Sequence, residues 1–179
     1  MTSIPNPLRP TSRFVTGRNR TDGTSIFESA VDEKPPTTTH PDGMEISFCY
    51  ATQAFPINVS HDQDIKVYDD FVQNPPGILV PNGSAARIID FPPGYTTRMH
   101  RSMTLNYNVV IEGEVEVILD SGETRCLKPG DSLVQRAINH AWRNTSETEW
   151  ARITAVVLPI IGLDQFAPEE GSQGVPSKA

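Results

Sequence analysis

The feature that most constrains the fold is a long run of short alternating segments separated by turns, between residues 78 and 158. ARIIDF, MTLNYNVVI, EVEVIL and WARITAVVL alternate with the turns PPG, EG, DSGE and KPGD. Turn signals recur about every eight to twelve residues, which is typical of β-sandwiches and closed barrels. The sequence therefore predicts an all-β domain of many short strands.

The segments outside this run predict one domain with a flexible segment at each end. Residues 1–20 are polar and contain proline without periodicity, which predicts a flexible arm. Residues 167–179 have the composition of a disordered tail. A length of 179 residues suits a single domain, so we expect residues 21–166 to form one domain around the 78–158 region.

Two further strands and one helix are expected before residue 78. TSIFESA at 24–30 and MEISFCYATQ at 44–53 are predicted strands, joined by the linker VDEKPPTTTHPDG. A helix is predicted within 59–77, where Ser60 and Gln63 fit a capping box. One helical face carries three apolar residues, Ile65, Tyr68 and Val72.

Charge and hydropathy exclude two classes of partner. The net charge is −7 and the basic residues are scattered, whereas nucleic-acid binding requires a clustered basic face. No apolar run approaches the roughly 20 residues of a membrane-spanning helix. MTSIPNPLRP lacks the apolar core of a signal peptide, so we expect a cytoplasmic protein that binds neither membrane nor nucleic acid.

Polar side chains share one face of the predicted strand between residues 98 and 108. The even positions are all polar: Arg98, His100, Ser102, Thr104, Asn106 and Asn108. The odd positions from 103 onward are apolar: Met103, Leu105, Tyr107, Val109 and Ile111. A later strand likewise places His140, Trp142 and Asn144 on one face. Such a stripe is either the solvated face of a sheet or the lining of a cavity, and spacing alone leaves both open.

These residues resemble the two motifs of the cupin family, small jelly-roll barrels built as a double-stranded β-helix. The first motif runs from a glycine through His-x-His and a glutamate to a second glycine. Gly94, His100 and Gly113 fall at its places, whereas Ser102 replaces the second histidine and Asn106 the glutamate. In the second motif Gly130, His140 and Asn144 match, and Gln135-Arg136-Ala137 stands near the usual Pro-x-Gly.

The segments RFVTGRNRTDGTSIF and PNGSAARIIDFPPGYTTRMHR extend the similarity to short single-domain cupins of fungal secondary-metabolite gene clusters. In that subgroup the second histidine is commonly missing, and an aspartate is usual where Asn106 stands. The resemblance implies a cupin jelly-roll barrel with amino-terminal strands and one short helix. It also implies a small-molecule substrate inside the barrel.

The resemblance also bears on cofactors, because a cupin metal site normally gathers three histidines and a carboxylate. Only His100 and His140 match, so we expect no metal cofactor. The two imidazoles are the predicted catalytic groups, since one ring can remove a proton while the other donates one. The predicted substrate-binding residues are Arg98, Ser102, Asn106, Asn108, Gln135 and Trp142. Trp142 fits either an aromatic clamp or an ordinary core residue.

The sequence thus predicts a metal-independent cupin enzyme of secondary metabolism, a non-redox lyase, isomerase or cyclase. It would carry out dehydration, decarboxylation, isomerisation or cyclisation of a polyketide-like or aromatic molecule. The alternatives are a metal-dependent cupin oxygenase that uses His100 and His140, and a non-catalytic small-molecule-binding barrel. We also expect a homodimer, because the arm can cover only part of the apolar face at 105–111.

Overall fold

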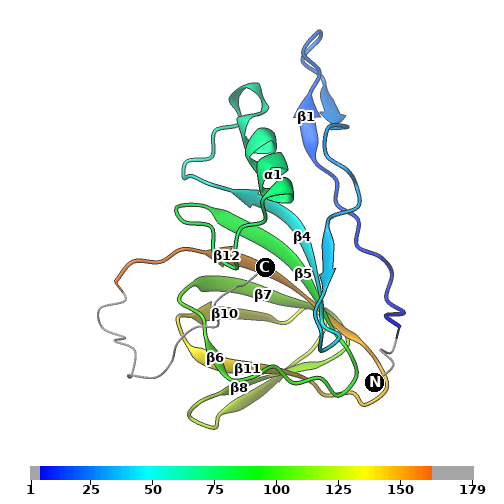
Figure 1. Ribbon diagram of the computed structural model, residues 1–179, viewed down its shortest axis with the longest axis vertical. Coiled ribbons are helices and arrows are strands. Elements are labelled where there is room, and N and C mark those ends of the chain that lie inside the picture. The colour runs from blue at the N-terminus through cyan, green and yellow to red at the C-terminus, as the bar shows by residue number, and fades with distance from the viewer. Residues whose placement is uncertain (1–4, 163–179) are drawn as a thin grey trace.

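The computed structural model describes residues 5–162, which form two antiparallel sheets packed face to face (Figure 1). The larger sheet contains β10 (Ser132–Arg136), β7 (Leu105–Glu112), β12 (Ala151–Leu158), β5 (Ser84–Phe91), β4 (Glu45–Thr52) and β3 (Thr37–Thr39), in this order. The smaller sheet contains β6 (His100–Arg101), β11 (Asn139–Asn144), β8 (Val115–Leu119) and β9 (Thr124–Leu127). The all-β prediction is confirmed.

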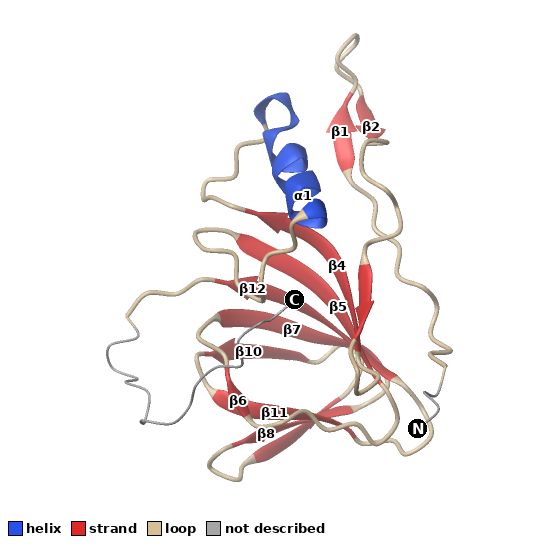
Figure 2. Cartoon of the chain, viewed as in Figure 1, coloured by secondary structure: helices blue, strands red, loops and turns tan. Residues whose placement is uncertain are grey.

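The remaining elements lie at the β3–β4 end of the molecule. A 3-10 turn η1 (Ser60–Asp62) leads into the helix α1 (Gln63–Gln73), and β1 (Thr16–Arg18) pairs with β2 (Ser25–Phe27). Figure 2 shows α1 and the β1–β2 hairpin on the side of the larger sheet far from β8 and β11. Within residues 5–162 no helix is long and apolar enough to span a membrane.

Buried and exposed side chains alternate along the strands, which distinguishes an inner and an outer face of the larger sheet. Asn106, Asn108 and Val110 on β7 are buried, whereas Tyr107 and Ile111 between them are exposed. The inner face packs against the smaller sheet in one apolar cluster: Phe91, Val110, Val115, Val117, Trp142, Ala151 and Ile153. The predicted parity is confirmed for residues 104–111, whose even-numbered side chains are buried. The single strand expected over 98–108 is wrong, because His100 and Arg101 form β6 of the smaller sheet and Arg98 is exposed.

The helix forms as its apolar spacing predicts, but its beginning differs from the prediction. Tyr68 is buried against β4, and Ile65 and Val72 pack on the same cluster. The capping box of Ser60 and Gln63 is wrong, since the N-cap is Asp62 and no side chain caps the helix. His61 and Asp62 have left-handed φ angles of 52° and 57°, so the chain enters through a distorted turn.

The linker predicted between the first strands contains β3, which was not expected. Thr37–Thr39 pairs with Glu45–Ser47 at the edge of the larger sheet. The two prolines before it do not interrupt this strand because they precede its first paired residue. Three consecutive β-branched residues suit an extended edge strand.

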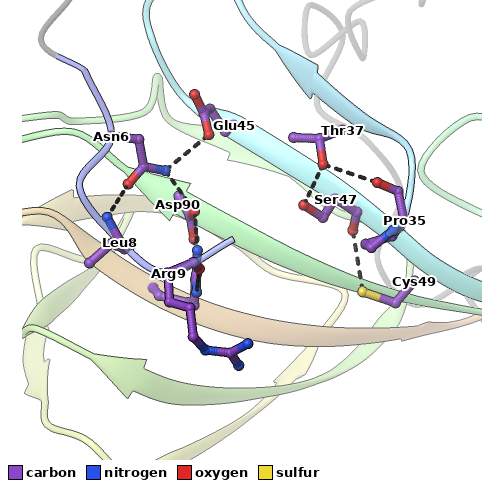
Figure 3. A network of polar contacts seen from close by, with 10 residues as sticks. Asn6, Leu8, Arg9, Pro35, Thr37, Glu45, Ser47, Cys49 and Asp90 are labelled. Atoms are coloured by element: carbon purple, nitrogen blue, oxygen red, sulfur yellow. Dashed lines mark hydrogen bonds and ion pairs between the residues drawn. The ribbon is translucent and has the colours of Figure 1, made fainter. Parts of the chain in front are cut away.

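The amino-terminal arm is held against the outer face of the larger sheet (Figure 3). Asn6 Nδ2 donates to Glu45 and Asp90 at 2.9 and 2.8 Å, and Arg152 Nη1 donates to the Arg9 carbonyl at 2.8 Å. Beneath it Arg152 and Asp90 form a buried two-bond ion pair, each bond 2.6 Å long. Residues 1–20 were predicted to be a flexible arm. In the structure, residues 5–20 are instead attached to the domain by these hydrogen bonds and by the pairing of β1 with β2. The predicted tail, 167–179, lies outside the described residues.

Candidate functional site

A tight turn at Gly113 passes the chain from the larger sheet to the smaller sheet. Gly113 joins β7 to β8 with a φ of 72°, and a Cβ there would lie 2.8 Å from the Ala151 Cβ. Both the left-handed backbone and this close approach require glycine. The turn lets β8 leave the larger sheet and pair with β11, which carries His140.

His140 lies inside the barrel, in contact with His100. The two residues are opposite each other in the β6–β11 pair, and their ring centroids are 4.3 Å apart with a tilt of 50°. The His140 side chain is almost fully buried, with 2 % of the residue exposed, whereas His100 is exposed. One ring of the pair therefore faces the interior and the other reaches solvent.

Burial holds His140 in its neutral form. Its pKa is lowered from the usual 6.5 to about 4, chiefly by burial and then by the nearby His100. The backbone carbonyls of Ile138 and His100 oppose this shift without cancelling it. His140 Nδ1 lies 3.3 Å from the Ile138 carbonyl oxygen and 3.4 Å from Gln135 Nε2. At neutral pH the His140 ring is therefore uncharged.

The His100 ring is oriented by a backbone carbonyl just before β6. Its Nδ1 lies 2.8 Å from the Arg98 carbonyl oxygen, which can only accept a hydrogen bond. The contact therefore favours a proton on Nδ1 and leaves Nε2 to exchange protons with solvent or with a bound molecule.

Four buried polar side chains share the interior with His140. Thr104, Asn106 and Asn108 project inward from β7 and its approach, and Gln135 on β10 is directly opposite Asn106. Within the described residues, Thr104 Oγ1, Asn106 Oδ1, Asn108 Nδ2 and Gln135 Oε1 have no hydrogen-bond partner. Buried polar atoms without a partner cost free energy unless water or a ligand satisfies them. They make this part of the barrel the candidate binding site.

The other predicted binding residues are placed differently. Arg98 is exposed, and its described contact with the site is its carbonyl rather than its guanidinium. Ser102 is half-buried and donates its backbone N–H to the Ile138 carbonyl at 3.3 Å. Trp142 belongs to the apolar core and presents its ring at 86° to His140, with centroids 6.1 Å apart. The Trp142 ring therefore belongs both to the core and to the wall beside His140.

Two residues that support the site were not identified as doing so from sequence. Ala137 has a φ of 48°, in the left-handed region, and its N–H donates to the Thr104 carbonyl at 2.9 Å. It stands one residue before the place where the family motif usually has glycine, in the turn between Gln135 and His140. Asn144 Nδ2 donates to the carbonyls of Phe91, Pro92 and Glu149 at 3.1, 3.0 and 2.8 Å. Asn144 is therefore a structural residue that joins the end of β11 to two loops.

The donor set does not fit the usual cupin metal centre. Across residues 5–162, no group of three or more His, Cys, Asp or Glu side chains is placed to hold a metal ion. Ser102 and Asn106 occupy the places of a histidine and a carboxylate, so only two imidazoles are present. Neutral hydroxyl and amide oxygens are weak ligands for a transition metal.

Comparison with known proteins identifies the family. The family model described as "Cupin domain" matches residues 87–157. The chain is 40% identical over 84% of its length to "Phomopsin biosynthesis cluster protein D" of Diaporthe leptostromiformis, and the match covers 79% of that protein. This chain belongs to the cupin family. The resemblance found in the two motifs and the cupin fold are thereby confirmed.

Two other relatives are also fungal proteins. It is 38% identical to "Oryzines biosynthesis cluster protein J" of Aspergillus oryzae, over 88% of each chain. It is 34% identical to the "Cupin-domain-containing oxidoreductase srdB" of Neurospora crassa, over 89% of this chain and 80% of that one.

Proposed function

We propose that this cupin is a metal-independent enzyme of secondary metabolism that performs acid/base chemistry on a polyketide-like or aromatic molecule. The relatives from biosynthesis clusters support the setting. The observation that carries the chemistry is a buried, neutral His140 whose ring lies 4.3 Å from the solvent-exposed His100.

In the proposed mechanism His140 removes a proton from the substrate, and His100 exchanges protons between the site and solvent. At any pH well above 4 the His140 imidazole is in its neutral form, the only form that can act as a base. As negative charge develops on a substrate oxygen, the unpartnered Asn108 Nδ2 can donate a hydrogen bond to it. Dehydration, isomerisation and ring closure can begin with such a proton removal. Decarboxylation instead releases CO₂, and it shares only the stabilised oxyanion and the later return of a proton to carbon.

One observation favours a second candidate, a metal-dependent oxygenase. A relative at 34% identity carries the name oxidoreductase. The side chains argue against an oxygenase, because residues 5–162 contain no group of three or more His, Cys, Asp or Glu side chains placed to hold a metal ion. A non-catalytic binding barrel is the third reading, and it requires the two histidines to serve only the pocket wall.

The proposal is tested by solvent deuterium incorporation, which detects proton removal even when the natural product is unknown. The protein, treated with chelator, is incubated in D₂O with small β-diketones and acylphenols, and exchange at carbon is followed by mass spectrometry and NMR. We expect exchange by wild-type protein after chelation and loss of exchange in His140→Gln, with Tyr107→Phe on the outer face as the matched control. Exchange that appears only when iron, manganese or zinc is added back supports the oxygenase reading. Absence of exchange with every probe supports the binding barrel.

A further inference from the structure

The barrel interior beside His140 is polar but carries no charge. Thr104, Asn106, Asn108 and Gln135 are neutral by chemistry, and His140 is neutral because it is buried. A ligand in this space therefore meets dipoles and one imidazole rather than a carboxylate or a cation.

The buried charged side chains in the described part of the chain are all engaged elsewhere. Asp90 and Arg152 bond to each other beneath the arm on the outer face of the sheet. Arg87 donates to the carbonyls of Gly77 and Ile78, and its guanidinium lies over the Phe48 ring, toward β4. Asp90 and Arg152 lie on the outer face of the sheet. Arg87 shares a cross-strand row with Ala155 and Asn108, but its guanidinium is already bonded to the carbonyls of Gly77 and Ile78.

The unpartnered atoms of the interior require a ligand that both donates and accepts hydrogen bonds. Asn106 Oδ1 and Gln135 Oε1 can only accept, Asn108 Nδ2 can only donate, and Thr104 Oγ1 can do either. Rotation of an amide exchanges its oxygen and nitrogen, but the set still needs both kinds of partner. A carboxylate offers acceptors alone, so it would leave the amide oxygens without a donor.

The strand beside these amides is apolar. Ala155 and Val157 on β12 are buried, and they lie directly across from Asn108 and Asn106. A bound molecule thus meets hydrogen-bonding groups along one edge and hydrocarbon along the neighbouring wall.

We infer that the substrate enters with an uncharged group that donates and accepts hydrogen bonds, such as a hydroxylated ketone or enol on an aromatic or short polyketide skeleton. This inference rests on the proposed function and narrows it. A free carboxylate on the substrate, placed beside these amides, would lose its hydration without gaining a counter-ion, at a large cost in free energy. Decarboxylation is therefore the least suitable of the four reactions, and dehydration, isomerisation and cyclisation remain.

The test uses two ligands that differ only in the charged group. 3-Hydroxyacetophenone and 3-hydroxybenzoate share a ring and a phenol, and they carry a methyl ketone and a carboxylate of similar size. Each is titrated into the full-length, chelator-treated protein at neutral pH, and the side-chain amide ¹⁵N–¹H signals of Asn106, Asn108 and Gln135 are followed. We expect the ketone to bind at least about tenfold more tightly than the benzoate and to shift these signals.

Two variants show whether the amides cause the preference. Asn108→Leu keeps the size of the side chain and removes the donor, and should weaken the ketone about tenfold with little change for the benzoate. Tyr107→Phe, the neighbouring residue on the outer face, should leave both affinities unchanged. Equal or tighter binding of the benzoate, shifts confined to other residues, or no binding of either ligand at millimolar concentration overturns the inference. Because the readout is binding, preferential ketone binding without deuterium exchange would refute the proposed catalysis and leave this inference standing.

Discussion

The ring of His140, closed inside the barrel, lies 4.3 Å from the ring of His100, which is open to solvent. Two imidazoles at this separation repel each other when both are protonated. The buried member carries the larger desolvation cost, so its protonation is the one suppressed. This difference in environment gives the two histidines different roles.

The first prediction concerns the titration of this pair. His140 should stay neutral as the pH falls from 7 and become protonated only near pH 4. If neutral His140 is the base, kcat/KM falls as the pH drops through this value and is constant above it until another group titrates. His100→Ala removes the opposing charge and opens the ring to water, so it should raise the pKa of His140. NMR titration of the imidazole ¹⁵N signals measures the His140 pKa in wild-type protein and in the variant. A value near 6.5 in wild-type protein would contradict the role of burial and of His100 in keeping His140 neutral.

The second prediction concerns the turn that carries His140. Ala137 has a φ of 48° and is buried, so a β-branched residue there would add strain to a conformation that already disfavours side chains. Ala137→Val should lower the free energy of unfolding by about 2 kcal/mol or more. Ala137→Gly should change stability by less than about 1 kcal/mol, because relief of strain offsets the greater freedom of the unfolded chain. Urea denaturation measures both, and equal losses would show that the φ angle is not responsible.

The third prediction concerns the missing metal ligands. Purified wild-type protein should contain no stoichiometric transition metal, because Ser102 and Asn106 stand for a histidine and an acid. The double variant Ser102→His, Asn106→Glu should bind zinc at least about a hundredfold more tightly than wild type. Isothermal titration calorimetry with zinc, together with elemental analysis, makes the comparison. Near one metal per wild-type chain, with activity lost on chelation and restored by metal, would favour the oxygenase.

The fourth prediction concerns the outer face of β7 and β10, which the arm leaves open. Tyr107 and Val134 are opposite each other there, 50% and 54% exposed, and Ile111 is 45% exposed. A second copy of the chain would cover these residues, so we expect a dimer of 19.7 kDa subunits. Val134→Arg should convert it to monomer, whereas Ile57→Arg, at an exposed apolar residue away from this face, should not. Light scattering that gives a monomer for wild type at micromolar concentration contradicts the prediction.

Much of the site followed from the sequence because strand alternation is a local property. Spacing alone placed Asn106 and Asn108 on one face, and the apolar residues between them made the opposite face distinct. The alternating pattern also predicted a sandwich or closed barrel, since each strand carries its own apolar side, but the division of the strands between two sheets comes from the structure. The family motifs then indicated that this polar face was interior rather than solvated.

The rest depended on contacts between distant residues. Neighbouring sequence does not show that His140 is buried while His100 is exposed, because this follows from how β6 packs at the edge of the smaller sheet. Asn144 reads as a site residue by parity, yet it bonds to carbonyls of two separate loops. The strand at Thr37–Thr39 forms only because β4 offers it an edge.

The measurement that tests the account most directly is the rate of proton exchange catalysed by His140→Gln, compared with wild type under chelation. Glutamine fills similar space and hydrogen bonds but cannot accept the proton. If His140 is the base, the variant should be folded, with an NMR spectrum unchanged away from the barrel interior, and its kcat should be lowered about 10²–10⁴-fold. A folded His140→Gln protein that keeps near wild-type turnover would contradict acid/base catalysis by His140 and leave pocket shape as the source of activity.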